Sequence, residues 1–255
     1  MNRFYVRNSQ IEGKFVFIEG TDVNHMKNVL RLMPGDHIEV SDGEGVLYTC
    51  AVAAYQKGIA QAEILSSRLS DTELGARLIL FQGLPKKDKM DLIVEKAVEL
   101  GASTVYPVET ARSVEQVHDP ARAEKKLDRW QRIAESAAKQ SKRGVIPEVH
   151  AICSFGEMLQ EVEKLDICLI PYELAEDMKE TDRVILRCRE IVKKKPNASI
   201  GIVIGPEGGF EEEEVRKAAA AGAVPVTLGR RILRTETAGL AALSILMYEL
   251  EDRAE

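Results

Sequence analysis

Two segments near the C-terminus contain the residue types best suited to chemistry. Residues 204–210 read Ile-Gly-Pro-Glu-Gly-Gly-Phe, and residues 228–238 read Leu-Gly-Arg-Arg-Ile-Leu-Arg-Thr-Glu-Thr-Ala. Each follows a short β-branched run and precedes a helix-like stretch, so both are predicted loops at the carboxyl ends of strands, where open α/β sheets bind ligands. A glycine-rich loop beside a cationic loop indicates a cofactor without phosphates and an anionic polymer.

The first segment does not match the dinucleotide fingerprint G-x-G-x-x-G. Glu207 stands where the second glycine is required, and Pro206 removes a donor amide. Four glutamates at 211–214 open the next helix, where they would repel a pyrophosphate. An NAD site is therefore disfavoured, and an NADP-dependent reductase using Arg230 is a weaker alternative.

S-adenosylmethionine suits this segment better, because main-chain donors and acceptors can read the edge of its adenine. Gly205, Gly208 and Gly209 lack the Cβ atoms that would obstruct that edge. On this segment alone, a tight strand-to-helix turn that binds nothing is an equally good interpretation.

The second segment places Arg230, Arg231 and Arg234 within five positions. Arginine is well suited to bidentate phosphate contacts. We expect one arginine to pair with Glu207 or Glu236, which leaves at least one for a substrate. Thr235 is the predicted N-cap of the apolar helix that follows.

The composition is that of an ordinary folded protein. The chain has 255 residues, 45% hydrophobic and 30% charged, with a formal net charge of −6. Phosphate binding needs only a local basic face, and lysines and arginines do cluster locally. No apolar run approaches the ~18 residues of a membrane span, and the first residues lack the apolar stretch of a secretion signal. We therefore expect a cytoplasmic protein that does not enter a membrane.

A metal enzyme is not expected. Cys50, Cys153, Cys168 and Cys188 form no Cys-x-x-Cys pair, and the four histidines show no His-x-x-x-His spacing. Cys168 lies in an apolar run and is predicted to be a buried hydrophobe.

The chain divides into two regions of different texture. Residues 1–70 are predicted to form a small β-barrel of five or six strands, interrupted by one helix over 22–32. From residue 76 to 255, strands alternate with helices, which predicts a parallel sheet covered on both faces. The predicted strands are 77–82, 104–108, 166–171, 199–204 and 224–228. The predicted helices are 88–100, 120–142, 154–164, 177–194, 211–221 and 235–252.

Six blocks in chain order resemble the SPOUT methyltransferase superfamily. The most similar family is RsmE, which methylates N3 of a uridine in small-subunit ribosomal RNA. The matching blocks are 3–6, 25–31 with 35–36, 86–101, 129–141, 204–210 and 228–238. They extend over nearly the whole chain.

The resemblance implies an α/β fold with a trefoil-knotted parallel sheet, preceded by a PUA-like RNA-binding barrel. It also implies a homodimer, and S-adenosylmethionine bound in the knot. The implied cofactor residues are Tyr172, Glu173, Ile204, Gly205, Pro206, Glu207, Gly208, Gly209, Leu228, Gly229, Ile232, Leu233, Thr237 and Ala238. The implied substrate is 16S ribosomal RNA in the assembled 30S subunit.

Two residues are candidates for the chemistry. Deprotonation of uridine N3 builds negative charge on the ring, and Arg234 is placed to stabilise it. Glu236 is a weaker candidate for proton acceptor, because neighbouring arginines lower its pKa. Arg112 is assigned no role, since Ala111 stands where the family pattern has a more polar residue.

RNA placement is assigned to basic residues as phosphate contacts. The set is Arg3, Arg7, Arg31, Lys86, Lys87, Lys89, Arg143, Arg230 and Arg231. Trp130 lies at helical spacing between Leu127 and Ile133, so it is predicted to be core rather than a stacking platform. An RNA-binding factor without catalysis is the alternative from another class.

Overall fold

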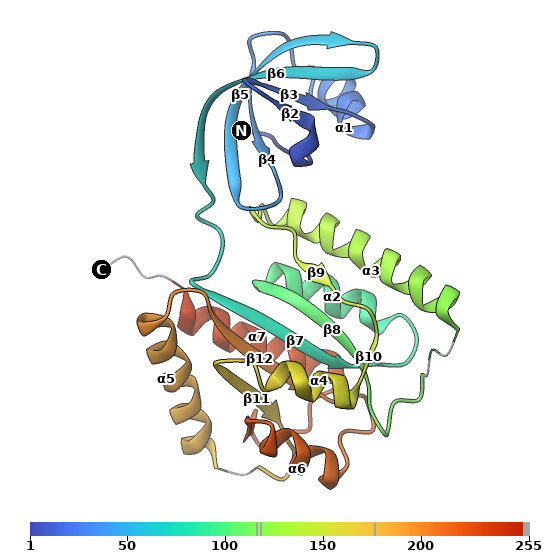
Figure 1. Cartoon of the computed structure of the whole chain (residues 1–255), viewed down its shortest axis with the longest axis vertical. Coiled ribbons are helices and arrows are strands. Elements are labelled where there is room, and N and C mark those ends of the chain that lie inside the picture. The colour runs from blue at the N-terminus through green and yellow to red at the C-terminus, as the bar shows by residue number, and fades with distance from the viewer. Residues whose placement is uncertain (116, 118, 176, 252–255) are drawn as a thin grey trace. The chain divides into compact units, whose positions relative to one another are not determined.

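The computed structural model describes residues 1–115, 117, 119–175 and 177–251, and it contains two compact units (Figure 1). The first unit comprises residues 1–73 and 138–146, and the second comprises residues 74–137 and 147–255. Residues 138–146 thus return to the first unit, which a single boundary near residue 70 does not anticipate.

The first unit is built on a six-stranded sheet in the order β1-β4-β5-β6-β3-β2. Its strands are β1 (Arg3–Tyr5), β2 (Ile11–Glu12), β3 (Phe15–Ile18), β4 (His37–Ser41), β5 (Val46–Gln56) and β6 (Ile59–Leu69). Only β1 and β4 pair in parallel; the other neighbours are antiparallel. A 3-10 turn (Asn8–Gln10), α1 (Thr21–Asn24) and a π-helical turn (His25–Val29) complete the unit.

The alternation of the strands explains the core of this unit. Every second residue of β3 and β4 is buried, including Val16, Ile18, Ile38 and Val40, and Met26 from the helical segment packs against the same cluster. The predicted strand count is confirmed. The edge strands β1 and β2 form no pairing with each other in the described residues, so the hydrogen-bonded sheet is open rather than a closed barrel.

A buried ion pair fastens residues 138–146 to this unit. The side chain of Arg143 is 6% exposed, and its guanidinium pairs with the carboxylate of Glu73, which also accepts the backbone N–H of Gly144 at 3.0 Å. The hydroxyl of Tyr5 donates to the carbonyl of Arg143, and burial raises the pKa of that hydroxyl. Arg143 is therefore a structural residue, and we withdraw it from the predicted RNA contacts.

The second unit alternates strands and helices, as the sequence predicted. Its strands are β7 (Ala76–Gly83), β8 (Ala102–Glu109), β9 (Glu148–Val149), β10 (Cys153–Ser154), β11 (Ile167–Pro171), β12 (Ala198–Ile204) and β13 (Ala223–Val226). Its helices are α2 (Lys89–Glu99), α3 (Pro120–Gln140), α4 (Phe155–Val162), α5 (Met178–Lys194), α6 (Glu212–Ala220) and α7 (Thr235–Leu250). The last three residues of α3 belong to the first unit.

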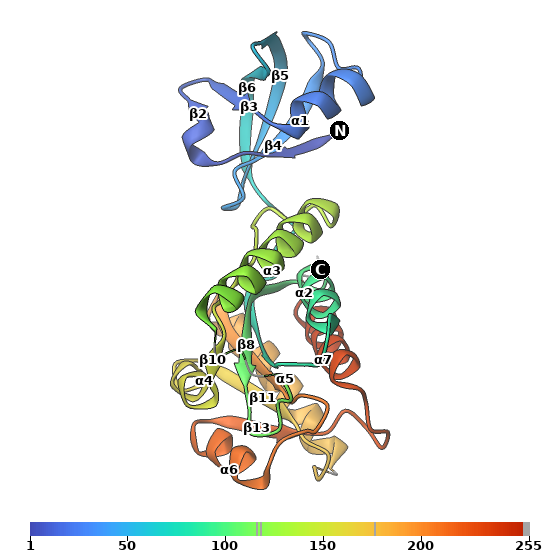
Figure 2. The same ribbon diagram turned by 90° about the vertical axis from the view of Figure 1, so that its right-hand side faces the viewer.

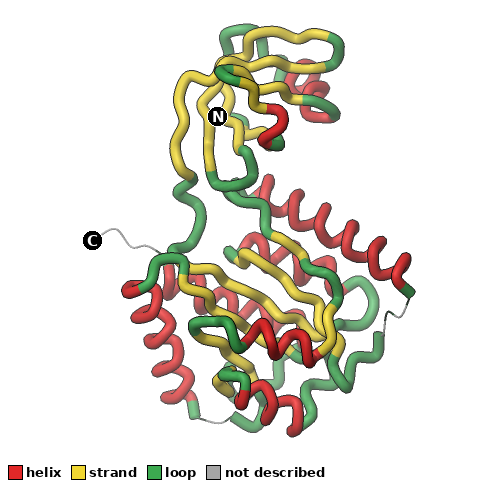
Figure 3. The backbone as a smooth tube through the Cα atoms, in the orientation of Figure 1, coloured by secondary structure: helices red, strands yellow, loops and turns green. Residues whose placement is uncertain are grey.

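All pairings in the second sheet are parallel, and the order is β10-β8-β7-β12-β11-β13, with β9 beside β8. Figure 3 draws the strands in yellow and the surrounding helices in red. Helices cover both faces: α2 and α7 lie on one side, and α4 lies on the other (Figure 2). The central strand β12 is buried along its whole length, because both faces are covered. Trp130 is 3% exposed, so its assignment to the core is confirmed.

No helix in the described part of the chain is both long and apolar enough to cross a bilayer.

The Arg143–Glu73 pair yields a stability prediction. Replacing Glu73 with Ala should lower the free energy of unfolding of the first unit by about 2–4 kcal/mol, because a buried guanidinium loses its carboxylate partner. Amide hydrogen exchange over residues 138–146, together with urea unfolding of the full chain, measures the change.

Glu63 provides a control in the same unit, because its ion pair with Lys14 is exposed. The side chain of Glu63 is 42% exposed and that of Lys14 is 67% exposed. Glu63→Gln should alter stability by less than about 0.5 kcal/mol. Equal effects of the two substitutions would contradict a structural role for Glu73.

Candidate active site

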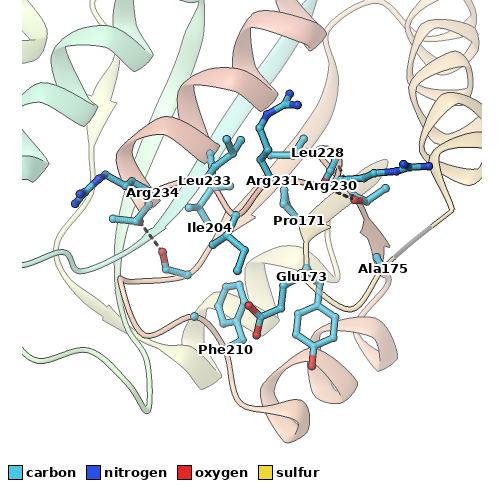
Figure 4. Close-up of a pocket in the computed structure, with 18 of the residues that line it drawn as sticks. Pro171, Glu173, Ala175, Ile204, Phe210, Leu228, Arg230, Arg231, Leu233 and Arg234 are labelled. Carbon is cyan, nitrogen blue, oxygen red and sulfur yellow. Dashed lines mark hydrogen bonds between the residues drawn. The ribbon is translucent and has the colours of Figure 1, made fainter.

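The candidate site is a cavity of about 1010 Å³ in the second unit, large enough for a small-molecule ligand. Its walls come from the carboxyl ends of three adjacent strands: β11, β12 and β13. Figure 4 shows Ile204, Phe210 and Glu173 at its centre, with the segment from Leu228 to Arg234 along one side. Both segments singled out from the sequence therefore line one cavity.

The glycines of the first segment mainly serve the packing of the turn. The N–H of Gly209 donates to the carbonyl of Pro206 at 3.0 Å, and Gly209 has a φ of 67°, which favours glycine. A Cβ on Gly205 would lie 3.2 Å from the backbone of Gly209. These glycines are predicted to expose the main chain to a ligand. Gly205 also allows the two ends of the loop to pack closely.

Arg112 supports this turn from outside the cavity. Its guanidinium donates to the carbonyl of Gly208 at 3.0 Å, and a Cβ on Gly208 would meet the Arg112 side chain at 3.0 Å. The neighbouring N–H of Ala111 donates to Glu214 at 2.9 Å, which links the same loop to α6. Arg112 thus receives the role that the sequence could not assign.

A buried hydroxyl joins the two segments. The Oγ1 of Thr235 donates to the carbonyl of Gly205 at 2.6 Å and accepts from the side-chain amide of Gln82 at 2.8 Å. Gln82 and Thr235 are 0% and 5% exposed. The prediction that Thr235 is an N-cap is wrong: Arg234 occupies the N-cap position of α7, and the Thr235 hydroxyl is committed to the glycine turn.

The start of the second segment is fixed by α5. Thr181 of α5 exchanges two hydrogen bonds with the backbone of Thr227, at 3.0 and 3.2 Å. The three arginines beyond it are exposed, and their guanidinium groups point in different directions (Figure 4). None forms an ion pair with another described residue. They are therefore available to an anionic ligand.

Lys89 pairs with both candidate carboxylates. Its ammonium lies 3.0 Å from Glu207 and 3.1 Å from Glu236. The two nearby carboxylates, Glu207 more than Glu236, raise the pKa of Lys89. Burial opposes ionisation of both carboxylates, but Lys89 and backbone N–H groups more than offset it, so the pKa of each lies below its ordinary value. The expected arginine–glutamate pair is thus wrong, because lysine occupies that place.

Most of the predicted cofactor residues line the cavity. These are Tyr172, Glu173, Ile204, Gly205, Pro206, Glu207, Gly208, Gly209, Leu228, Gly229, Ile232, Leu233 and Ala238. Thr237 does not, because it is exposed on α7 outside the cavity. Ile232 lies at the cavity but is 86% exposed. Arg234 also lines the cavity, whereas Glu236 reaches it only through Lys89.

The predicted RNA contacts fall into two groups. Arg7, Arg31, Lys86, Lys87, Arg230 and Arg231 are exposed. Arg3 is not available as predicted, because its side chain is 8% exposed, pairs with Glu39 at 2.7 Å and donates to the carbonyl of Lys142. Lys89 is committed to two carboxylates, so we remove it from the set as well.

Sequence analysis missed several residues of the site. Ala175 and the start of α5 at Asp177–Lys179 also line the cavity, and so does Phe210, which ends the first segment but was not assigned to the cofactor. Gln82 was missed although a signal existed, since it is a lone amide directly after the apolar run 78–81 of β7. Among the described residues, no group of three or more His, Cys, Asp or Glu side chains could hold a metal ion.

Comparisons with known proteins agree with this geometry. Residues 72–247 match the model of an RNA methyltransferase domain, and residues 18–65 match an RNA methyltransferase PUA domain. Ribosomal RNA small subunit methyltransferase E of Bacillus subtilis is 37% identical over 98% of both chains. The protein of that name from Mycobacterium bovis is 32% identical over 94% of this chain and 88% of its own.

A solved structure has a similar fold. It is the crystal structure of ribosomal RNA small subunit methyltransferase E from Neisseria gonorrhoeae bound to S-adenosyl methionine. It is 33% identical, covers 97% of each chain and has a TM-score of 0.78. The matched domains extend over both units, and the reductase alternative is thereby excluded. The chain belongs to the ribosomal RNA small subunit methyltransferase E family.

Proposed function

We propose that the protein transfers a methyl group from S-adenosylmethionine to N3 of a uridine in 16S ribosomal RNA. The observation that carries the proposal is the single cavity that joins the glycine turn to the arginine segment. Gly209 and Gly229 both have positive φ values, and a Cβ on either would point into open space. Main chain is thus exposed where an adenine edge could be read.

The residues present fit this cofactor. Bound S-adenosylmethionine would supply an electrophilic methyl group, whose in-line transfer to N3 would release S-adenosylhomocysteine and the N3 proton. The turn after β12 and the segment after β13 would hold and orient the cofactor, so that catalysis rests on positioning and electrostatics. No metal ligand is needed for such a transfer.

Arg234 is the proposed charge-stabilising group. It lines the cavity, is exposed and forms no ion pair among the described residues. Its guanidinium can approach the anionic uridine ring. Glu236 remains the weaker candidate for proton acceptor, because its ion pair with Lys89 favours the ionised form and makes it a poor base.

We further propose that the substrate is the assembled 30S subunit and that the protein acts as a homodimer. Exposed basic residues of both units would contact phosphates, and binding should weaken steeply with salt.

The exposed side chains of Leu92 on α2 and of Ile245 and Tyr248 on α7 support the homodimer, because a second copy could cover them. α7 packs on β7 and β12, and we retain the trefoil knot as part of this proposal.

Nucleoside mass spectrometry tests the reaction. The purified chain with S-adenosylmethionine should form 3-methyluridine on 30S subunits from a strain lacking the gene. The same assay on deproteinised 16S RNA shows whether free RNA is also a substrate. A methylated nucleoside other than 3-methyluridine would refute the assigned position. Calorimetry with S-adenosylmethionine decides against a non-catalytic RNA-binding factor, which would show no heat of binding.

The buried Thr235 hydroxyl yields a prediction for cofactor affinity. Thr235→Val keeps the shape but removes the link between Gln82 and Gly205, so affinity for S-adenosylmethionine should fall about tenfold, with ~1–3 kcal/mol lost from stability. Calorimetry and urea unfolding measure the two effects. Thr237→Val, on the same turn but outside the cavity, should change neither; equal losses in both variants would contradict this reading.

Arg234 yields a prediction for the chemical step. Arg234→Ala should lower the single-turnover methylation rate by about 10²–10³-fold, because the anionic ring loses a charge-assisted partner. Affinity for S-adenosylmethionine should stay within about threefold. Arg216→Ala on α6, which removes an exposed pair with Glu213, is the control. An unchanged rate in the Arg234 variant would remove it from the mechanism.

A further inference from the structure

Lys89 lies where three parts of the second unit meet. It is the first residue of α2, and its ammonium contacts Glu207 in the turn after β12 and Glu236 in the first turn of α7. Its side chain is 29% exposed and lines the cavity. The ion pairs of Lys89 are therefore part of the cavity wall.

The two carboxylates depend on Lys89 to different degrees. Glu207 also accepts the backbone N–H of Lys86 with both oxygens, at 3.2 Å each. The Oε2 atom of Glu236 is shielded from solvent and has no directed hydrogen bond within the described residues. The ammonium 3.1 Å away is its charge partner. Loss of Lys89 would leave this buried oxygen unpaired, which is costly.

The ion pairs of Lys89 connect the same two segments as the hydrogen bonds of Thr235. Thr235 joins Gly205 to the start of α7 by hydrogen bonds, and Lys89 joins Glu207 to the next residue of the same helix by ion pairs. Arg234 is the N-cap of that helix. The glycine turn and the backbone of Arg234 are thus held by two adjacent contacts.

We propose that Lys89 is a positioning residue that couples the methyl-donor pocket to the RNA-binding side of the site, by holding the glycine turn and the first turn of α7 in one arrangement. The inference rests on the proposed function. It replaces the sequence-based assignment of Lys89 as a phosphate contact. A phosphate would have to compete with two carboxylates at 3.0 and 3.1 Å for the same ammonium. The exposed Lys86 and Lys87 have no such competitors among the described ion pairs.

The test compares Lys89→Met, which keeps an apolar stem of similar length, with Lys89→Arg, which keeps the charge. Three quantities are measured on the full chain: the Kd for S-adenosylmethionine with and without RNA, the single-turnover rate at saturating RNA, and the KM for RNA at several salt concentrations. Wild-type affinity for S-adenosylmethionine is measured first, because its absence would overturn the proposed function itself.

For Lys89→Met, we expect the saturated rate to fall about 10- to 100-fold, because the reacting groups are misplaced. The Kd for S-adenosylmethionine without RNA should change less than about threefold, and the effect of RNA on that Kd should disappear. Lys89→Arg should recover most of the rate. A wild-type rate with a raised KM and a salt slope reduced by about one would show a phosphate contact and overturn the inference.

Two further variants complete the test. Lys87→Met, two positions before Lys89 in the chain, should show the phosphate-contact pattern of raised KM and reduced salt slope. Glu207→Gln combined with Lys89→Met removes the repulsion between the carboxylates, so part of the lost rate should return. If Lys89→Met does not fold, the double variant is used in its place. A wild-type rate in the double variant would overturn the inference.

Discussion

The site depends on one buried hydroxyl. Thr235 is the only described side chain that hydrogen-bonds both the carbonyl of Gly205 and the side chain of Gln82, and it does so away from solvent. In a low-dielectric interior such a bond is strong when made and costly when lost. It fixes the distance between the end of β12 and the start of α7, and therefore between the glycine turn and the arginine segment.

The ion pairs of Lys89 are a second contact between the same two segments that Thr235 joins by hydrogen bonds. Lys89 neutralises one of the two carboxylates that face it, so the three exposed arginines of the neighbouring segment are not consumed by Glu207 or Glu236. Had an arginine made such a pair, as the sequence suggested, its guanidinium would be held at a carboxylate. The position of one lysine thus leaves the arginines of this segment without an ion pair among the described residues.

The sequence predicted the strands and helices from residue 76 onward well, because apolar runs such as 199–204 and helical periodicity such as that of 120–140 are long enough to be recognised. It missed β9 and β10, which have two residues each and no periodicity. It also missed the pairings of Arg143 and Lys89. Which carboxylate a basic residue meets depends on contacts distant in sequence, such as the 70 positions between Glu73 and Arg143.

The glycine turn is packed closely from behind as well as facing the cavity. A Cβ on Gly83 would meet the backbone N of Pro206 at 2.6 Å, and one on Gly208 would meet Arg112. These glycines let β7 and the loop of Arg112 pack closely against the turn. The main chain that faces the cavity is therefore held from behind, and residues outside the cavity control its shape. A ligand read by backbone groups is recognised only as well as that backbone is fixed, so the packing behind the turn is part of the binding site.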